Sequence, residues 1–223
     1  MINEKWKIFV IIPAYNEEKI IAQTIAEVKN YCPNVVVVDD GSADETRFKA
    51  ESAGAVILRH IINRGQGAAL RTGINYAIKK EADIVVTFDA DGQFDALEIT
   101  KVCQPIIEKK CDVVLGSRFL EKNKIPLAKN LLLKSAIIFT KMITGMELSD
   151  VHNGFRAFNK KAAEKIVIRQ DRMAHASDII HEIARLHLKY QEVPVTVKYT
   201  DYSKKKGQKI SGALKIIFDL IFK

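Results

Sequence analysis

The sequence predicts an α/β domain in which helices cover both faces of a mostly parallel central sheet. Short apolar runs rich in Val and Ile alternate five times with helical repeats before residue 118. These runs are apolar at consecutive positions, as is typical of parallel strands buried between two layers of helices. Such alternation also predicts right-handed crossover connections. A chain of 223 residues can bury one substantial core, so we expect a single domain.

The expected strands end at polar or turn residues and cover residues 8–12, 35–38, 55–58, 84–88 and 113–115. The helices between them show apolar residues at three- and four-residue spacing. Asn16 is expected to cap the first helix and Asp44 to open the second. The third helix should follow Gly67 and run to about Lys80, and the fourth should span roughly 95–109.

The pattern loosens after Arg118, where we expect a loop at 119–128, helices at about 129–144 and 174–188, and a strand at 192–199. Over the final residues, 210–223, polar residues recur every four positions, which predicts an amphipathic helix. At 1.5 Å per residue this helix reaches about 21 Å, too short to cross the ~30 Å hydrocarbon core. We therefore expect one domain over residues 1–200. Residues 201–223 should form a basic segment and a helix that either packs on protein or lies on a membrane surface.

Composition narrows the class of partner. The formal net charge is +8, which favours anionic nucleotides, phosphates or membrane surfaces. The chain lacks a basic stripe interleaved with aromatic residues, so nucleic acid is not an expected partner. Cys32, Cys103 and Cys111 are odd in number and form no Cys-x-x-Cys pair, which argues against a disulfide framework or a zinc site. Without a signal-peptide core or an apolar run of about 18–20 residues, we expect a soluble or peripheral cytoplasmic protein.

The central expected strand, residues 84–88, ends in two carboxylates. Asp89 and Asp91 stand two positions apart, and Gly92 follows them. Ligands of parallel α/β sheets collect beyond the carboxyl ends of the strands. Carboxylate oxygens in a tight turn suit Mg²⁺ or Mn²⁺, which complete their coordination with substrate phosphate oxygens. A solvated turn without a ligand is the simpler alternative for an isolated Asp-x-Asp pair.

The same Asp-x-Asp-Gly stretch also resembles the aspartyl-phosphate loop of haloacid-dehalogenase phosphatases, in which the first Asp is a nucleophile. That loop follows the first strand and continues into Thr. Here the stretch follows about the fourth strand and continues into Gln93 and Phe94. The phosphatase hypothesis is therefore the weaker one.

Two further strand ends carry polar clusters, Pro-Ala-Tyr-Asn-Glu at 13–17 and Asp-Asp-Gly-Ser at 39–42. Because parallel strands end at one edge of a sheet, the three clusters together could hold a base, a ribose and a diphosphate. Gly65-Gln66-Gly67 is faintly similar to a dinucleotide-binding fingerprint, but it follows the third strand and Leu70 replaces the third glycine. Its glycines are expected to allow a tight turn or a close backbone approach to a ligand.

Five short motifs follow one another along the chain: residues 11–18 (Ile-Ile-Pro-Ala-Tyr-Asn-Glu-Glu), 37–42 (Val-Val-Asp-Asp-Gly-Ser), 89–93 (Asp-Ala-Asp-Gly-Gln), 116–118 (Gly-Ser-Arg) and 153–156 (Asn-Gly-Phe-Arg). Together they resemble family 2 glycosyltransferases of the GT-A fold. Within that family the chain is most similar to the polyprenyl-phosphate sugar synthases, such as dolichyl-phosphate mannose synthase and its glucosyl relatives. The resemblance spans roughly residues 8–160 and implies a GT-A, Rossmann-like domain.

The resemblance implies roles for the residues at matching positions. The nucleotide would be held by residues at the first, second and fourth strand ends: Pro13, Ala14, Tyr15, Glu17, Asp39, Asp40 and Ala90. The divalent ion that bridges the donor diphosphate, Mg²⁺ or Mn²⁺, would be bound by Asp89, Asp91 and Gln93. Phosphate of the donor or of the acceptor would meet Ser117, Arg118 and Ser135. The catalytic set would be Asp91, Arg118 and Asp150, with Asp150 as a base or as a carboxylate that orients the acceptor. Arg156 would be structural or phosphate-facing, and His152 lies nearby without an assigned role.

The chain departs from the dolichyl-phosphate mannose synthases at one position. Those enzymes tend to carry an Arg four residues before the Ser at position 135, whereas Leu131 stands there, with Lys129 and Lys134 nearby. Lysine supplies positive charge but not the bidentate fork of a guanidinium. The departure puts the mannosyl branch and the role of Ser135 in doubt.

The activity implied by the resemblance is an inverting transfer of a hexose, mannose or glucose, from a nucleotide sugar to a polyprenyl phosphate. It would take place at the cytoplasmic face of the membrane, with the membrane surface, a membrane protein or a second copy of the chain as further partners. The alternatives are a family 2 enzyme with a saccharide or protein acceptor, and a binding domain of the same fold without catalysis. The sequence alone does not choose the sugar, the base or the lipid length.

Overall fold

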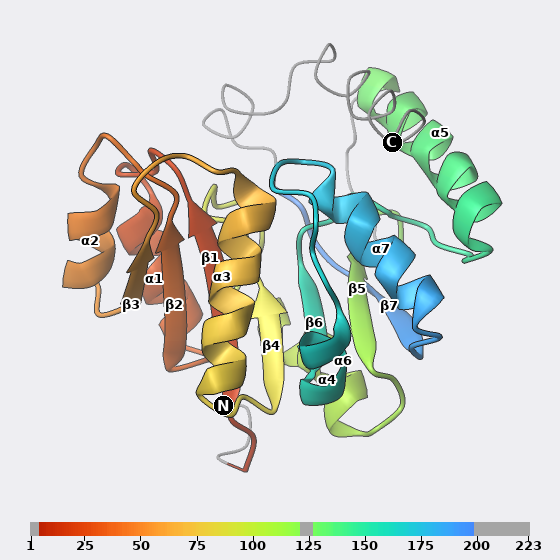
Figure 1. Ribbon diagram of the computed structural model, residues 1–223, viewed down its shortest axis with the longest axis horizontal. Coiled ribbons are helices and arrows are strands. Elements are labelled where there is room, and N and C mark those ends of the chain that lie inside the picture. Colours follow the sequence, from red (N-terminus) through yellow and green to blue (C-terminus); the bar gives the residue numbers. More distant parts are fainter. Residues whose placement is uncertain (1–4, 121–126, 199–223) are drawn as a thin grey trace.

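The computed structural model describes residues 5–120 and 127–198, with the backbone alone for residues 127–134. Its strands are β1 (Ile8–Ala14), β2 (Asn34–Asp39), β3 (Val56–Arg59), β4 (Ile84–Thr87), β5 (Val113–Ser117), β6 (Arg156–Asn159) and β7 (Tyr190–Pro194). Its helices are α1 (Ile21–Lys29), α2 (Thr46–Ser52), α3 (Gln66–Lys79), α4 (Glu98–Ile107), α5 (Leu127–Thr144), α6 (Lys160–Lys165) and α7 (His175–Arg185). Strands and helices alternate up to β5 (Figure 1), as the sequence predicts.

The described part of the chain forms one seven-stranded sheet in the order β3-β2-β1-β4-β6-β5-β7. β1 pairs in parallel with β2 and β4, β2 with β3, and β5 with β7. Among the described strands only β6 is antiparallel, and it lies between β4 and β5. The prediction of a mostly parallel sheet is confirmed. Because β6 runs the other way, its first residue lies at the edge where the parallel strands end.

Alternate residues of the strands supply two cores, one on each face of the sheet. On one face, Val10 and Ile12 of β1 belong to a buried cluster that also contains residues of α1, α2 and α4. On the other face, Phe9 and Ile11 belong to a cluster with residues of α3, α6 and α7, the helices in front of the sheet in Figure 1. Both faces of β1 are therefore covered, which explains its unbroken apolar run.

The first helix begins later than predicted. α1 starts at Ile21, and its N-cap makes no side-chain hydrogen bond. Asn16 instead adopts a left-handed backbone conformation, with φ of 54°. Its backbone N–H donates to Ser42 Oγ and its Oδ1 accepts from the backbone of Ala43, both at 2.9 Å. The prediction that Asn16 caps α1 is therefore wrong, because asparagine tolerates this backbone conformation and its side chain joins a neighbouring loop.

The second half of the chain differs more from the sequence expectation. β6 and the short α6 were not expected, and β7 begins and ends earlier than the predicted strand at 192–199. α4 begins at Glu98 rather than at Asp95, whose Oδ1 accepts from the backbone of Leu97 in a turn before the helix. A strand of four residues that starts with a buried arginine carries too little apolar pattern to be recognised.

Two expectations concern membranes. Within the described ranges, no helix combines the length and apolar character needed to cross a bilayer. The amphipathic helix expected at 210–223 lies outside the described residues, as does the basic segment before it.

Candidate active site

The loops that follow β1 and β2 are joined by hydrogen bonds. The backbone N–H of Asp40 donates to the carbonyl of Ala14 at 2.8 Å, which continues the β1–β2 pairing past the end of both strands. The backbone N–H of Glu17 donates to Thr46 Oγ1 at 2.7 Å, so the loop after β1 is also tied to the start of α2. Tyr15 lies between the two bonded residues Ala14 and Glu17, and its side chain is 47% exposed. Its ring therefore stands at the surface of the sheet edge where the nucleoside is expected.

Asp39, the last residue of β2, has an unsatisfied oxygen. Its side chain is fully buried, and Oδ1 accepts from the backbone N–H of Ser42 at 3.0 Å. Oδ2 lies 3.3 Å from Arg59 Nε, close enough for an ion pair, but the geometry is not that of a hydrogen bond, so Oδ2 accepts none within the described structure. A buried acceptor without a donor is costly and rare. A ligand N–H or O–H would satisfy it.

Asp40 differs from Asp39 because both of its oxygens accept hydrogen bonds from protein. Oδ1 lies 2.6 Å from His60 Nδ1 and 3.0 Å from the backbone nitrogen of Arg64. Oδ2 accepts from the backbone N–H of Gly65 at 2.6 Å. His60 is held from its other side by Thr72 Oγ1 at 2.9 Å. Asp40 therefore fixes the loop before α3, and its contact with a nucleoside stays a prediction.

Asp89 and Asp91 lie just beyond the end of β4. Gln66 Nε2, from α3, donates to Asp89 Oδ1 at 2.8 Å. Asp89 Oδ2 lies against Gly154, where an added Cβ would come within 2.6 Å of it. Asp91 Oδ1 accepts from the backbone N–H of Gln93 at 3.1 Å and so fixes the turn. Burial, and then the negative charge of Asp91, raise the pKa of Asp89 above the ordinary aspartate range, although Arg156, Arg118 and Gln66 oppose the shift.

A divalent cation fits this pair of carboxylates. Two carboxylates close enough to raise the pKa of one of them repel each other, and a cation between them would remove that repulsion. Among the described residues no group of three His, Cys, Asp or Glu side chains forms a metal cage. Mg²⁺ and Mn²⁺ do not need one, since they bind through one or two carboxylates together with substrate phosphates. Asp89 and Asp91 match that requirement, and Gln93 lies at the turn beside them.

Arg118 and Asp150 form a buried ion pair next to the end of β5. Arg118 Nε donates to Asp150 Oδ2 at 2.5 Å, and the backbone N–H of Arg118 donates to the same oxygen at 3.2 Å. The other oxygen, Oδ1, accepts from the backbone N–H of His152 at 3.2 Å. Asp150 is 2% exposed and Arg118 is 6% exposed. The carboxylate thus orients the Arg118 guanidinium, and a role of Asp150 as a base stays a prediction.

Glu192 of β7 anchors the loop that carries Asp150. Its carboxylate accepts from the backbone N–H groups of Ser149 at 2.9 Å and of Asp150 at 3.1 Å. Ser149 Oγ lies 2.6 Å from Ser117 Oγ, so β5, β7 and this loop are joined at one point. No local pattern singles out Glu192, because its role depends on contacts with a loop that is distant in the chain.

The loop of residues 151–155 is built around the buried Arg156. Its Nε donates to the carbonyl of Asn153 at 2.9 Å and its Nη2 to the carbonyl of Val151 at 3.2 Å. Burial lowers the pKa of Arg156 to about 10, while Asp150 and Asp89 oppose that shift. Arg156 thus shapes the loop and places positive charge near the two acidic residues.

Two polar atoms of this loop have no hydrogen-bond partner within the described structure, His152 Nδ1 and Asn153 Nδ2. Burial lowers the pKa of His152 to about 4, and Arg156 and Arg118 lower it further against the effect of Asp150. His152 is therefore neutral at physiological pH. Sequence reasoning gave neither residue a role, although both stand directly before the Gly-Phe-Arg motif.

The glycines of the Gly65-Gln66-Gly67 stretch allow a turn and a close backbone approach: Gly65 has φ of +108°, and the backbone that comes close is another segment of the chain. An added Cβ on Gly67 would lie 2.0 Å from the carbonyl oxygen of Gln170, and one on Gly65 would lie 2.5 Å from that of Asp171. The glycines therefore admit another segment of the chain, the one that precedes α7. The residue between them, Gln66, is the one that reaches Asp89.

Ser135 differs in exposure from the other residues that are expected to bind phosphate. It is on α5, where its side chain is exposed, whereas Ser117 and Arg118 are buried at the end of β5. Its role at an acceptor phosphate stays a prediction, as does that of Gln93 at the metal.

Comparison with known proteins identifies the family. The Glycosyl transferase family 2 sequence model matches residues 9–167, which is more than half of the chain. The chain belongs to glycosyltransferase family 2. All five motifs named above fall inside the matched range, so the family assignment and the strand-end clusters agree. This family 2 protein is therefore a glycosyltransferase, and the resemblance seen in its sequence is confirmed.

Relatives match this glycosyltransferase over most of their length. An uncharacterised protein of Methanocaldococcus jannaschii is 40% identical, and the match covers 99% of this chain and 94% of the relative. The UDP-N-acetylglucosamine–dolichyl-phosphate N-acetylglucosaminyltransferase of Methanococcus voltae is 34% identical over 96% of this chain and 94% of its own. The dolichol-phosphate mannosyltransferase of Pyrococcus furiosus is 28% identical over 96% of this chain and 64% of its own.

Solved structures confirm the fold. Glucosyl-3-phosphoglycerate synthase from Mycobacterium tuberculosis, determined with Mn²⁺ and UDP-glucose, aligns with a TM-score of 0.76 over 97% of this glycosyltransferase and 77% of that chain. The sequence identity is 18%, so the likeness concerns the fold alone. It confirms the GT-A architecture expected from the sequence.

Proposed function

We propose that this glycosyltransferase moves a sugar from a nucleoside diphosphate to a polyprenyl phosphate, with inversion at the anomeric carbon. The observation that carries the proposal is the Asp89–Asp91 pair, which stands at the same sheet edge as the unsatisfied Asp39 oxygen. Such an edge suits a nucleoside at one end and a diphosphate with its cation at the other. The printed names of the relatives from Methanococcus voltae and Pyrococcus furiosus support a lipid phosphate as acceptor.

The donor would lie across the ends of β1, β2 and β4. Asp39 Oδ2 would accept a hydrogen bond from the base or ribose, with the Tyr15 ring beside it, and Pro13, Ala14, Glu17 and Ala90 would line this part. Asp89 and Asp91 would hold Mg²⁺ or Mn²⁺ against the diphosphate. When bound, the cation would supply charge neutralisation for the departing nucleoside diphosphate. Gln66 would keep Asp89 oriented toward that position.

The acceptor would approach from the side of Arg118. One oxygen of its phosphate forms the new bond to the anomeric carbon, while the bond from that carbon to the nucleoside diphosphate breaks on the opposite face. A phosphate is anionic at neutral pH, so the reaction needs no strong base. Asp150 therefore fixes the Nε side of Arg118, whose positive charge would hold the acceptor phosphate. Catalysis would depend mainly on positioning and on charge neutralisation.

The finer assignments concern the sugar, the ion and the location. The sequence resemblance favours mannose or glucose, while the relative from Methanococcus voltae is named for N-acetylglucosamine and a UDP donor. UDP-linked sugars are therefore the first donors to test. A polyprenyl phosphate acceptor would place the protein at a membrane surface, on the cytoplasmic face where nucleotide sugars are available.

Thermal unfolding with nucleotides tests the donor site. A ligand that binds the native state raises the melting temperature by mass action. UDP or GDP should raise it only when Mn²⁺ or Mg²⁺ is present, and the larger rise would identify the base. A rise of equal size without any divalent ion would contradict the assignment of Asp89 and Asp91.

A transfer assay tests the acceptor. UDP-N-acetylglucosamine, UDP-glucose and GDP-mannose should each be offered with a short polyprenyl phosphate, with an oligosaccharide and with a protein acceptor. Product that partitions into organic solvent only with the polyprenyl phosphate would support the proposal. Transfer to the saccharide or protein alone would replace it with the alternative acceptor class.

A further inference from the structure

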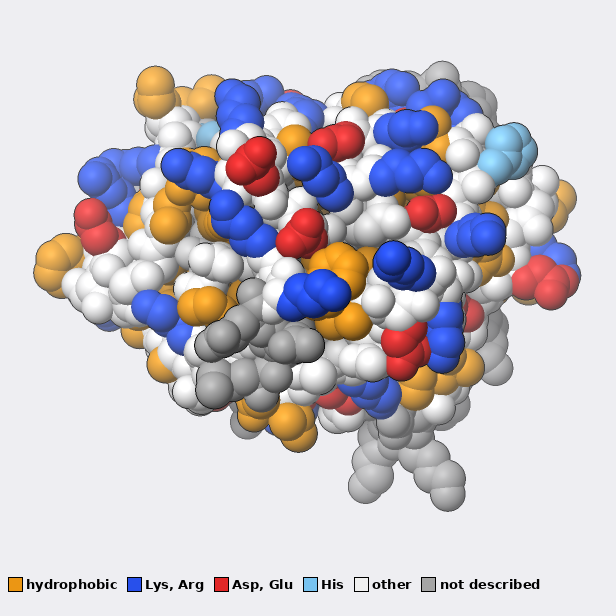
Figure 2. All heavy atoms as spheres, turned by 90° about the horizontal axis from the view of Figure 1, so that it is seen from below, with side chains coloured by type: hydrophobic (Ala, Val, Ile, Leu, Met, Phe, Trp, Pro, Cys, Tyr) orange, Lys and Arg blue, Asp and Glu red, His pale blue; other side chains and the backbone are white. Residues whose placement is uncertain are grey.

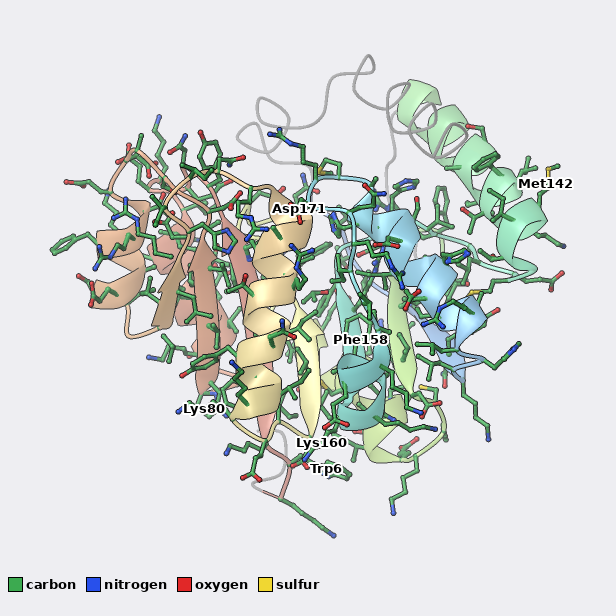
Figure 3. The ribbon with its side chains drawn as sticks, in the orientation of Figure 1. Trp6, Lys80, Met142, Phe158, Lys160 and Asp171 are labelled. Atoms are coloured by element: carbon green, nitrogen blue, oxygen red, sulfur yellow. The ribbon has the colours of Figure 1, made fainter. Side chains whose placement is uncertain are left out.

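A cavity of about 430 Å³ lies at the edge of the sheet opposite Asp89 and Asp91. It is bordered by residues that precede β1 and β5 and by residues that follow β6, among them Trp6 and Lys160. Figure 3 labels both of these residues at the lower ends of the strands. The volume is within the range of small-molecule sites, ~300–1,000 Å³. None of the residues assigned to glycosyl transfer lines it.

The inner wall of the cavity is apolar. Trp6 is partly buried and packs against the core cluster that contains residues of α1 and α4. Ile106 and Cys111 are 4% and 6% exposed, so they form part of the same core and only border the cavity. An aromatic ring on such a wall offers a flat surface for a planar group.

The rim of the cavity carries four lysines, Lys109, Lys160, Lys161 and Lys189. All four are exposed, and within the described residues none of their ammonium groups takes part in an ion pair. Figure 2 looks onto this edge and shows many Lys and Arg side chains around hydrophobic ones, with Asp and Glu side chains among them. Two carboxylates, Asp83 and Asp112, also line the cavity, so the four ammonium groups leave an excess of positive charge that a bound anion would neutralise.

The two carboxylates of the rim, Asp112 and Asp83, already accept hydrogen bonds from the protein. Asp112 Oδ1 accepts from Asn159 Nδ2 at 2.9 Å and its Oδ2 from the backbone N–H of Lys189 at 3.0 Å. Asp83 Oδ2 accepts from the backbone N–H of Lys7 at 2.8 Å. Both carboxylates thus fix the chain around the cavity, and the charges of Lys161 and Lys189 also act on Asp112.

We propose that this cavity, the basal pocket, binds an organic phosphate, with a mononucleotide as its simplest member. The planar part of the ligand lies against Trp6, and the phosphate pairs with Lys160, Lys161 and Lys189. Lysine binds phosphate as a compact point charge, and the apolar wall offers nothing to an inorganic ion. The pocket is separate from the transfer site, so it is a second ligand site whatever sugar the enzyme moves.

Trp6 makes the test specific, because it is the one tryptophan of the chain. Its emission reports on the basal pocket, while a nucleotide bound at Asp39 lies at the opposite edge of the sheet. The full-length protein is titrated with UMP, AMP, inorganic phosphate and uridine, with excitation at the red edge of tryptophan absorption. UMP or AMP should change the emission saturably, phosphate should bind at least about tenfold more weakly, and uridine should have no effect. No saturable change with either nucleotide would overturn the proposal.

Charge variants complete the experiment. Lys160→Ala/Lys161→Ala should weaken nucleotide binding at least about tenfold, which corresponds to ~1.4 kcal/mol. Lys79→Ala/Lys165→Ala removes the same charge from exposed positions outside the pocket and should bind like the natural protein. Equal affinity in the two double variants would contradict the proposal. Lys189→Ala, on another segment of the rim, gives a second measure if the first variant does not fold and should also weaken binding.

Discussion

At the scale of single residues, the role that we propose for Asp91 is chemical rather than structural. Its carboxylate accepts a hydrogen bond from the backbone N–H of Gln93 within a half-buried turn, and asparagine keeps an oxygen at that position. Asp91→Asn should therefore lower transfer at least about 100-fold, because charge at the diphosphate is no longer neutralised. The melting temperature without nucleotide should hardly change, and the metal-dependent rise with nucleotide should disappear.

Asp95→Asn provides the matched control for this prediction. Asp95 stands four residues further on and pairs with Lys198 at the surface. The variant loses the same charge near the same turn and should keep its transfer rate. Near-normal transfer by purified Asp91→Asn with metal present would show that the metal assignment is wrong.

Arg118 and Asp150, which we propose to lie at the acceptor phosphate, also form a buried ion pair that should stabilise the fold. Removing one partner of a buried ion pair leaves the other charged and unpaired, at a cost of ~3–5 kcal/mol. Arg118→Ala should therefore lower the free energy of unfolding by about 3 kcal/mol, measured by urea denaturation. Lys110→Ala breaks the exposed pair with Glu108 and should leave that free energy nearly unchanged. A small effect of both changes would mean that Arg118 is not buried in solution.

At the scale of elements, the start of α3 depends on the absence of a side chain at Gly67. A Cβ there would lie 2.0 Å from the carbonyl of Gln170, and the backbone on that side cannot yield as a side chain would. Gly67→Ala should lower the free energy of unfolding by roughly 2–3 kcal/mol and should displace Gln66 from Asp89. Urea denaturation measures the first effect, and weaker metal-dependent nucleotide binding reports the second.

Gly145 provides the control for Gly67, because an alanine there would strain the backbone without a steric clash. It has φ of +69° and nothing within 4 Å of an added Cβ, so Gly145→Ala should cost only about 1 kcal/mol. If the two alanine variants proved equally stable, the close packing of α3 on the segment before α7 would be contradicted.

Glu182 links α7 to the segment before it and gives the fold a pH dependence. Its carboxylate accepts from Arg185 at 2.8 and 2.9 Å, from Arg169 at 2.8 Å and from the backbone of Val167 at 3.3 Å. The hydrogen bonds from Arg185 lower the pKa of Glu182 most, burial opposes them, and Arg169 lowers the pKa further, to about 2. A lowered pKa means that the stabilisation is complete above the ordinary value of 4.5 and is lost as pH falls towards 2.

Glu182→Gln should therefore be less stable than the natural protein at pH 7, and the difference should shrink as the pH falls below about 4.5. Thermal unfolding across this pH range measures it. Glu164→Gln changes an exposed carboxylate of α6 and should show no such trend. A difference that stays constant with pH would show that Glu182 is not the group responsible.

At the scale of the whole molecule, the parallel half of the sheet could be predicted. Each of its strands is an apolar run, and each connecting helix has apolar residues at helical spacing. β6 could not be predicted in this way, since Arg156 opens it and its place between β4 and β5 depends on distant pairing. The strand ends were recognisable from their carboxylates, but the division of labour between Asp39 and Asp40 was not. Nothing in the local sequence shows that His60, Arg64 and Gly65 bind both carboxylate oxygens of Asp40. The same three residues bind neither carboxylate oxygen of Asp39.

The C-terminal segment carries a prediction that the described residues do not address. Residues 204–206 are three lysines, and an amphipathic pattern follows at 210–223. Truncation after Tyr202 should lower both the binding to anionic liposomes and the transfer to a long polyprenyl phosphate, since each lysine near such a surface contributes roughly 1 kcal/mol. Co-sedimentation with liposomes decides it, and equal binding by the two proteins would favour a helix that packs on protein.

The antiparallel strand β6 affects how the nascent chain folds on the ribosome. β1 to β4 can pair as soon as they emerge, but the outer edge of β4 must wait for β6, which is made much later. β5 emerges in between and waits for both of its neighbours, β6 and β7. During that interval an apolar strand edge stays open to other nascent chains, a common origin of aggregation. The residues from β6 to β7 therefore cover the strand edges that β4 and β5 leave open during synthesis.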